Sequence, residues 1–245
     1  MAKLPFFFST VLWSASASVP VMKMLADQAE ENVARAVSNE MITRISSFGS
    51  YDEERYDDFG NCVGTWQRDF FTCGSCYGDD DDDDEVKAEY KHFITQLTRR
   101  SAYLTIFGIF EHRMMECQKL MANLTGSEIK KLSIENCHKL LKKIGGNGIA
   151  DVNHFIVIRN VMAHSDGVAE KYSSLVKSQQ FPNESTRRRV NSVTRALNAD
   201  CGISISMSNN LIMDRCFLDN SIGEFEQYIG KLENAVRAFH EENEG

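Results

Sequence analysis

The strongest chemical signal in the sequence is an arginine and a histidine that stand five residues apart, Arg159 and His164. Arginine keeps its positive charge at any working pH and offers a planar fork of N–H donors to phosphate oxygens. Histidine titrates near neutral pH, so it can take a proton from a ribose 2′-hydroxyl or give one to a leaving oxygen. The two residue types are therefore suited to cleaving a phosphodiester bond.

Helices are expected to position this pair. Apolar residues recur at helical spacing from about 150 to 163, and Ser165-Asp166-Gly167 then marks a helix end, so His164 should lie at a helix C-terminus. An unusually apolar long helix is expected from about Val86 to Leu120. Another is expected from Ser127 to the Gly145-Gly146 break, with a lysine-rich outer face. A helix as apolar as the one from Val86 to Leu120 should lie at the centre of the fold.

Further elements are expected towards both ends of the chain. A long amphipathic helix should run from Met22 to Phe48, and Ser221 with Glu224 forms a capping box before a last helix. Alternating apolar residues at 203–214 flank a turn and predict one β-hairpin. Strands and helices do not alternate along the sequence, so there is no indication of a Rossmann sheet or a phosphate-binding loop. The sequence predicts an all-α fold, a helical bundle with a small hairpin near the C-terminus, as a single domain over residues 1–245.

The string Arg-Asn-Val-Met-Ala-His at residues 159–164 resembles the R-x4-6-H signature of the HEPN superfamily, in its RN-x3-H form. HEPN domains are bundles of about four or five helices with the motif late in a core helix, and residues 86–165 supply two long helices before it. The hairpin, the N-terminal helix and an acidic segment lie outside this common core, so the resemblance assigns no subfamily.

The resemblance also implies roles for individual residues. Arg159 would stabilise the charge that develops on the attacked phosphate, and His164 would be the general acid and base. Asn160 would orient the site or hold His164, which lies four residues later on the same helix face. Glu111, in the most apolar part of the long helix, is similar to the polar residue that many members place opposite the motif. It is therefore a further candidate for the site.

The activity implied by the resemblance is that of a HEPN-type endoribonuclease. The 2′-hydroxyl of RNA would attack the adjacent phosphate and leave a cyclic phosphate and a 5′-hydroxyl, with no metal or other cofactor. Two protomers usually dimerise so that their motifs line one shared cleft, so RNA and a second copy are the expected partners. HEPN proteins in bacteria are often toxins or antiviral defence effectors, so an antitoxin or another regulatory protein is a further expected partner.

The alternative is a non-catalytic HEPN module that binds nucleotide or RNA, or that serves as a dimerisation scaffold for a partner protein. In that case Arg159 would pair with a carboxylate such as Glu111. His164 would then only interact favourably with the C-terminal end of its helix.

The distribution of charge decides whether the net charge of −8 excludes a polyanionic partner. Residues 51–85 hold thirteen acidic residues and two arginines, a local charge of −11, which leaves +3 for the rest of the chain. This segment has no helical periodicity and ends in the run Asp79–Asp84, so we expect an exposed acidic loop inserted at about 50–85. The best basic cluster is a candidate RNA contact or a charged helix face, and it consists of Arg187, Arg188 and Arg189, with Arg195 nearby. The acidity therefore does not exclude RNA.

The cysteines and the N-terminus bear on location and on metal binding. Seven cysteines, an odd number, favour reduced thiols and a cytoplasmic protein over a disulfide framework. Residues 1–20 have the outline of a secretory signal, but polar residues interrupt the apolar run, so we favour a buried N-terminal segment. No stretch approaches the ~20 apolar residues of a membrane span. Structural zinc needs four ligands, and Cys62, Cys73 and Cys76 have only His92 as a candidate fourth, so we expect no metal.

Overall fold

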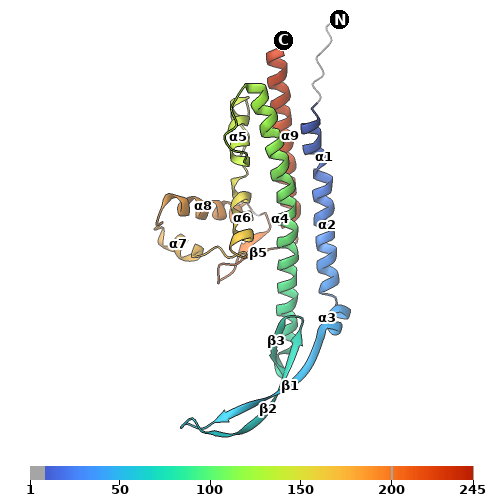
Figure 1. Cartoon of the computed structure of the whole chain (residues 1–245), viewed down its shortest axis with the longest axis vertical. Coiled ribbons are helices and arrows are strands. Elements are labelled where there is room, and N and C mark those ends of the chain that lie inside the picture. The colour runs from blue at the N-terminus through green and yellow to red at the C-terminus, as the bar shows by residue number, and fades with distance from the viewer. Residues whose placement is uncertain (1–8, 200, 245) are drawn as a thin grey trace. The chain divides into compact units, whose positions relative to one another are not determined.

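The computed structural model describes residues 9–199 and 201–244, which form mostly helices with a small amount of antiparallel sheet. The sequence predicted an all-α fold, and the structure confirms that the chain is mostly helical. The chain divides into two compact units, one made of Met1–Gln28 with Arg100–Gly245 and the other of Ala29–Arg99. Figure 1 labels α2 (Val19–Ala36) and α4 (Asp83–Thr125). Each of these two helices contributes residues to both units.

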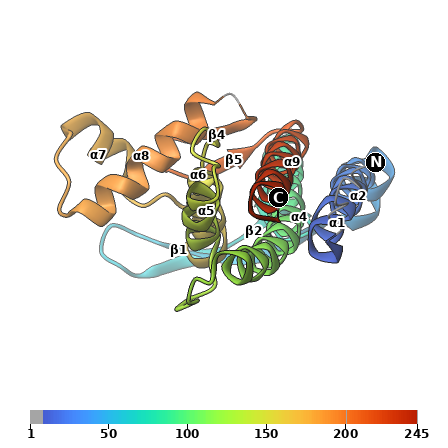
Figure 2. The same cartoon turned by 90° about the horizontal axis from the view of Figure 1, so that it is seen from above.

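The first unit is helical apart from one small hairpin. Its remaining elements are α1 (Thr10–Ala17), α5 (Ile134–Lys143), α6 (Asn153–His164), α7 (Tyr172–Ser178), α8 (Glu184–Asn198), β4 (Ile203–Ile205), β5 (Leu211–Met213) and α9 (Phe217–Glu244). Figure 2 shows α9 running beside the part of α4 that belongs to this unit, with α7 and α8 projecting to one side of α6. The hairpin expected at 203–214 is confirmed.

Aromatic side chains of α4 and α9 form the centre of the first unit and explain why α4 is so apolar. Phe110 and Phe225 stack with their ring centroids 4.2 Å apart and their planes 9° from parallel. Phe155 of α6 meets Phe225 edge-on at 5.1 Å. Tyr103, which is fully buried, donates a hydrogen bond of 2.9 Å to the carbonyl of Phe155. These contacts fix α6 to the core of the unit.

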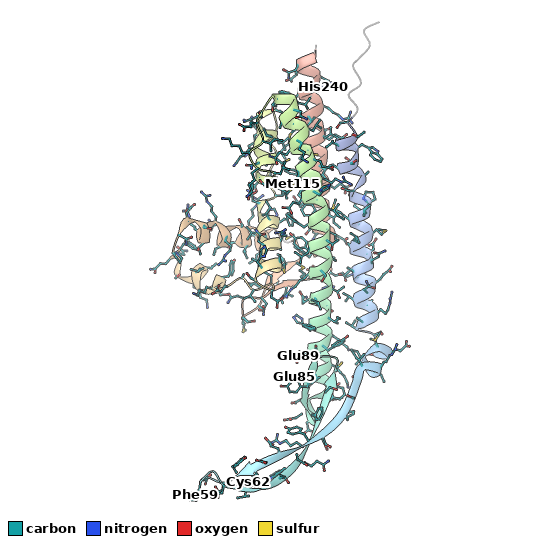
Figure 3. The ribbon with its side chains drawn as sticks, in the orientation of Figure 1. Phe59, Cys62, Glu85, Glu89, Met115 and His240 are labelled. Carbon is teal, nitrogen blue, oxygen red and sulfur yellow. The ribbon has the colours of Figure 1, made fainter. Side chains whose placement is uncertain are left out.

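In the second unit, a three-stranded antiparallel sheet stands where a loop was expected. β1 (Ser46–Tyr56) pairs with β2 (Cys62–Cys73), and β2 pairs with β3 (Cys76–Asp79). The expectation of a loop at about 50–85 was therefore wrong. Most of β1 and the first part of β2 are exposed on both faces, so their sequence lacks the alternation that reveals a strand with one buried face. Figure 3 shows Phe59 and Cys62 at the far end of this hairpin.

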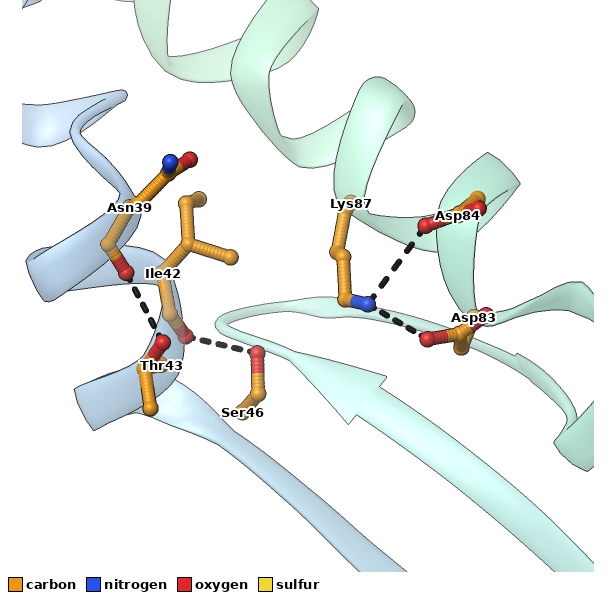
Figure 4. A network of polar contacts seen from close by, with 7 residues as sticks. All are labelled: Asn39, Ile42, Thr43, Ser46, Asp83, Asp84 and Lys87. Atoms are coloured by element: carbon orange, nitrogen blue, oxygen red, sulfur yellow. Dashed lines mark hydrogen bonds and ion pairs between the residues drawn. The ribbon is translucent and has the colours of Figure 1, made fainter.

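The acidic run is also structured. Asp79 ends β3, Asp80–Asp82 form the 3-10 helix η1, and Asp83 begins α4. Lys87 forms ion pairs with Asp83 and, at 3.5 Å, with Asp84 (Figure 4). The hydrogen bond from Lys87 lowers the pKa of Asp83. Carboxylates in a first helical turn interact favourably with the N-terminal end of the helix dipole, so the run starts a helix.

Two N-terminal expectations need correction. The long helix expected from Met22 to Phe48 is α2 followed by α3 (Asn39–Ile45), which Ser38 caps, and the chain then enters β1. A small core of Ile42, Phe71, Cys73, Cys76 and Val86 explains this, because it draws the chain after Ile42 into the sheet. Part of the favoured buried N-terminal segment, residues 1–8, lies outside the described residues, whereas Leu12 and Ala15 in α1 are buried.

Later boundaries differ because capping residues also occur inside helices and loops. The helix expected from Ser127 begins at Ile134, where the side chain of Ser133 accepts a hydrogen bond from the Asn136 N–H. The last helix begins at Phe217 rather than at the capping box of Ser221, whose buried hydroxyl donates to the Phe217 carbonyl. Across the part of the chain that the structure describes, none of the helices is both long and apolar enough to cross a bilayer.

Candidate functional site

Helix α6 places the arginine–histidine motif. Its buried side includes Phe155, Ile158 and Val161, which leaves Asn160 and His164 exposed on the other side. The helix ends at His164, and the N–H of Ser165 donates to the Val161 carbonyl at 3.1 Å. The predicted position of His164 at a helix C-terminus is confirmed.

An open groove of about 1040 Å³ runs along α6 and is bounded by α5 and α8. Both Asn160 and His164 line it, together with two acidic residues, Glu135 and Asp151. It also contains four cationic side chains that come from α5 and α8, namely Lys139, Arg188, Arg189 and Arg195. The groove therefore combines a titratable imidazole with a surplus of positive charge, which suits a phosphate-containing ligand.

His164 is available for chemistry within this groove. Its side chain is exposed, and it makes no hydrogen bond or ion pair with any residue that the structure describes. An imidazole with two uncommitted nitrogens can accept a proton at one nitrogen and donate from the other.

Arg159 lies outside the lining of the groove and is linked to it through Asn160. One terminal nitrogen of Arg159, Nη1, donates to Oδ1 of Asn160 at 3.0 Å. The other, Nη2, lies 3.7 Å from Oε2 of Glu111, and both side chains are about one third exposed. An ion pair of this length and exposure is worth less than ~1 kcal/mol, so Arg159 can exchange Glu111 for a phosphate.

The three consecutive arginines of α8 do not act alike. Arg187 and Arg188 both pair with Glu184, at 2.8 and 3.1 Å. Arg188 and Arg189 line the groove, whereas Arg187 does not. Arg189 makes no polar contact with the described residues. The structure thus brings two of the three predicted RNA-binding residues to the same groove as His164.

Arg195 and Asp151 tie the arginine-bearing helix to α6. Nη1 of Arg195 lies 2.7 Å from Oδ1 of Asp151, and Nη2 donates to the Asp151 carbonyl at 2.9 Å. Burial raises the pKa of Asp151, but hydrogen bonds from the Asn153 N–H and from Arg195 outweigh burial and leave the pKa low. Sequence reasoning missed Asp151, because an aspartate just before a helix is usually a local cap.

Two buried histidines lie in the same unit but cannot share the role of His164. Burial, with the nearby charge of Arg195, lowers the pKa of His154 to about 4, and its Nδ1 has no partner among the described residues. Burial also lowers the pKa of His138, whose Nδ1 lies 3.1 Å from the hydroxyl of Tyr228. Both imidazoles are buried, and burial makes each harder to protonate than an exposed ring, so neither can exchange protons with a ligand in the groove as His164 can.

Of the three thiols considered as zinc ligands, only those of Cys73 and Cys76 lie together. Cys62 is exposed at the start of β2, whereas Cys73 and Cys76 are buried at the other end of the sheet. His92 is exposed on α4. Within the described ranges, no group of three or more histidine, cysteine or acidic residues is arranged to hold a metal ion.

Comparisons of the chain with protein-family models, with curated proteins and with solved structures returned no match.

Proposed function

We propose that this protein is an endoribonuclease of the HEPN type that cleaves RNA without a metal ion. The observation that supports this most is the groove, in which the exposed and unpaired His164 lies with Arg188 and Arg189. Positive charge to hold a phosphate backbone and an acid–base group to move a proton are the two requirements of this reaction.

In the proposed reaction, Arg188 and Arg189 hold RNA phosphates in the groove. His164 takes the proton from a ribose 2′-hydroxyl, whose oxygen attacks the adjacent phosphorus. The bond to the 5′-oxygen of the next nucleotide breaks, and the protonated His164 gives its proton to that leaving oxygen. Arg159 moves from Glu111 to the phosphate, where it stabilises the developing negative charge. The products are a 2′,3′-cyclic phosphate and a 5′-hydroxyl.

His164→Ala and Arg159→Ala test this proposal directly. Each variant should lose cleavage of a labelled RNA, while its circular dichroism spectrum and melting temperature stay close to those of the wild type, because neither side chain is part of the core. His92→Ala removes another exposed histidine and should cleave normally. Cleavage should persist in EDTA and leave a cyclic phosphate. Full activity of a folded His164→Ala protein would sink the assignment.

A second candidate is a non-catalytic module that binds RNA or nucleotide in the same groove. The ion pair between Arg159 and Glu111 favours it, because it keeps the arginine away from the groove. Glu111→Gln separates the two proposals. If the pair merely restrains a catalytic Arg159, the variant should cleave at least as fast as the wild type. An RNA that binds tightly but stays intact with both proteins would favour the module.

The resemblance to the HEPN motif also extends the proposal to biological context. We propose a cytoplasmic bacterial toxin or antiviral defence effector that acts as a homodimer and is held in check by an antitoxin or another regulatory protein.

A further inference from the structure

The turn that follows His164 has an unusual backbone. Asp166 and Gly167 both have positive φ angles, 47° and 79°. Glycine adopts this left-handed conformation readily, but a residue with a Cβ atom does so at an energetic cost. A strained Asp166 is retained only where surrounding contacts hold it in place.

The hairpin β4–β5 supplies some of these contacts. The N–H of Leu211 in β5 donates to the Gly167 carbonyl at 2.9 Å, and the N–H of Ala169 donates to the Asn209 carbonyl at 2.9 Å. Val168 and Asn210 form an isolated antiparallel bridge between these two bonds. The hairpin, which the proposed reaction leaves without a role, thus supports the end of α6.

Arg100 of α4 completes the support from the other side. Its Nη1 donates to the Asp166 carbonyl at 3.0 Å, and its Nη2 donates to the Leu211 carbonyl at 3.3 Å. Only 19% of its side chain is exposed. A Cβ atom on Gly167 would lie 2.5 Å from Cζ of Arg100, so the guanidinium packs directly against the bare backbone of this glycine. One arginine thus joins α4, the turn after His164 and β5.

We propose that Arg100 is a positioning residue for His164. The inference rests on the proposed function, since it assigns Arg100 the task of holding the acid–base group in line with the scissile phosphate. Tyr103 lies three residues later on α4 and bonds to the Phe155 carbonyl near the start of α6. α4 therefore holds α6 near both ends, and Arg100 controls the end that carries His164.

Two variants test the contact between Arg100 and Gly167. Arg100→Ala removes the guanidinium, whereas Gly167→Ala adds a methyl group where the guanidinium lies. Arg99→Ala is the matched control, because Arg99 is the adjacent residue on the same helix, has a 12% exposed side chain and pairs with Glu30 at 2.7 Å. Loss of a partly buried arginine is common to Arg99→Ala and Arg100→Ala, but only the second affects the turn after His164.

Both Arg100→Ala and Gly167→Ala should lower kcat for RNA cleavage by about one to two orders of magnitude, with KM changed less than about twofold, because a misplaced acid–base group slows chemistry without weakening binding. Arg99→Ala should keep the wild-type kcat. Added guanidinium ion should restore part of the rate of Arg100→Ala and none of Gly167→Ala. A wild-type kcat in folded Arg100→Ala, or a raised KM with normal kcat, would overturn the proposal.

A second readout keeps the test valid if a variant is unstable or if the chain does not cleave RNA. The NMR signals of the His164 imidazole, assigned with His164→Ala, should shift or broaden in Arg100→Lys and Arg100→Ala but not in Arg99→Ala. Unchanged signals would overturn the positioning role by themselves. Inactive His164→Ala together with fully active Arg100→Ala would refute only the positioning role, whereas active His164→Ala would refute the proposed function.

Discussion

At the scale of single residues, His138 and His154 are buried whereas His164 is exposed, although all three lie on the adjacent helices α5 and α6. Burial disfavours the charged form of an imidazole, so the two buried rings are held neutral. Residue type alone therefore does not identify the acid–base group. The surroundings of each ring do.

His154 should make the stability of the protein depend on pH. Its pKa is about 4 in the folded protein and ~6.5 in an unfolded chain, so the unfolded chain binds the proton more tightly between these values. The contribution of the neutral His154 to the free energy of unfolding is complete above about pH 6.5, falls as the pH drops towards 4 and is lost below that pH. The total change is roughly 3 kcal/mol. Urea unfolding of wild type and His154→Gln across this range measures the effect.

The slope of the free energy of unfolding against pH should be smaller in His154→Gln than in the wild type. It should not vanish, because the pKa of His138 is shifted in the same direction. His112→Ala removes an exposed imidazole and serves as the matched control. Parallel curves for wild type and His154→Gln would show that another group causes the acid sensitivity.

At the scale of elements, α8 presents its arginines to two different environments. Arg188 and Arg189 line the groove, while Arg187 pairs with Glu184 away from it. Arg188→Ala and Arg189→Ala should each weaken RNA binding and reduce the slope of log K against log salt by about 0.7, the value for one lost phosphate contact on a single strand. Arg187→Ala should change neither quantity.

Arg189→Ala should weaken RNA binding more than Arg188→Ala does, because Arg188 also pairs with Glu184. An RNA with a 2′-deoxyribose at the cleavage position allows binding to be measured without turnover. Equal losses for all three arginines would mean that RNA follows the whole exposed side of α8 instead of the groove.

We expect the hairpin β1–β2 to contribute to stability through its base, where its buried residues lie. Its outer residues are exposed on both faces, whereas Phe71 and Cys73 belong to the small core of the second unit. Replacing residues 51–68 by an Asn-Gly turn between Ser50 and Asp69, which face each other in the register, should therefore leave the helical signal and the melting temperature almost unchanged. Phe71→Ala should cost about 3–5 kcal/mol, as loss of a buried phenylalanine usually does.

Calorimetry of the hairpin deletion and of Phe71→Ala compares the stability that each variant loses. A hairpin deletion as damaging as Phe71→Ala would mean that the outer strands are covered by another part of the protein or by a second copy.

At the scale of the whole molecule, the motif of one chain supplies one arginine and one histidine, Arg159 and His164. These are few groups to surround a scissile phosphate. We expect an isologous homodimer that brings the two His164 side chains close to its twofold axis. Light scattering should give twice the mass of 27.7 kDa at working concentrations. A monomer whose activity rises linearly with protein concentration would contradict this.

Mixed dimers give a stricter test of a shared cleft. His164→Ala still carries Arg159, and Arg159→Ala still carries His164. If the two motifs serve one cleft, mixing the inactive variants and allowing subunits to exchange should restore part of the activity. Mixing either variant with itself should restore none.

The sequence by itself determined the features that depend on neighbouring residues. Helical spacing and a stop signal placed His164 at the end of a helix, and an apolar run identified α4 as central. The alternation at 203–214 identified the hairpin β4–β5. These patterns span only a few residues, so local periodicity and turn chemistry are sufficient to reveal them.

Only the tertiary structure decided which side chains share a site. Lys139, His164 and Arg189 come from three different helices, and packing of α5 and α8 around α6 is what brings them to one groove. Packing of α4 against α6 turned Arg159 towards Glu111 and placed Arg100 against the turn after His164. The sequence did not predict the strands β1 and β2, because they are defined by backbone pairing with each other and not by a buried face.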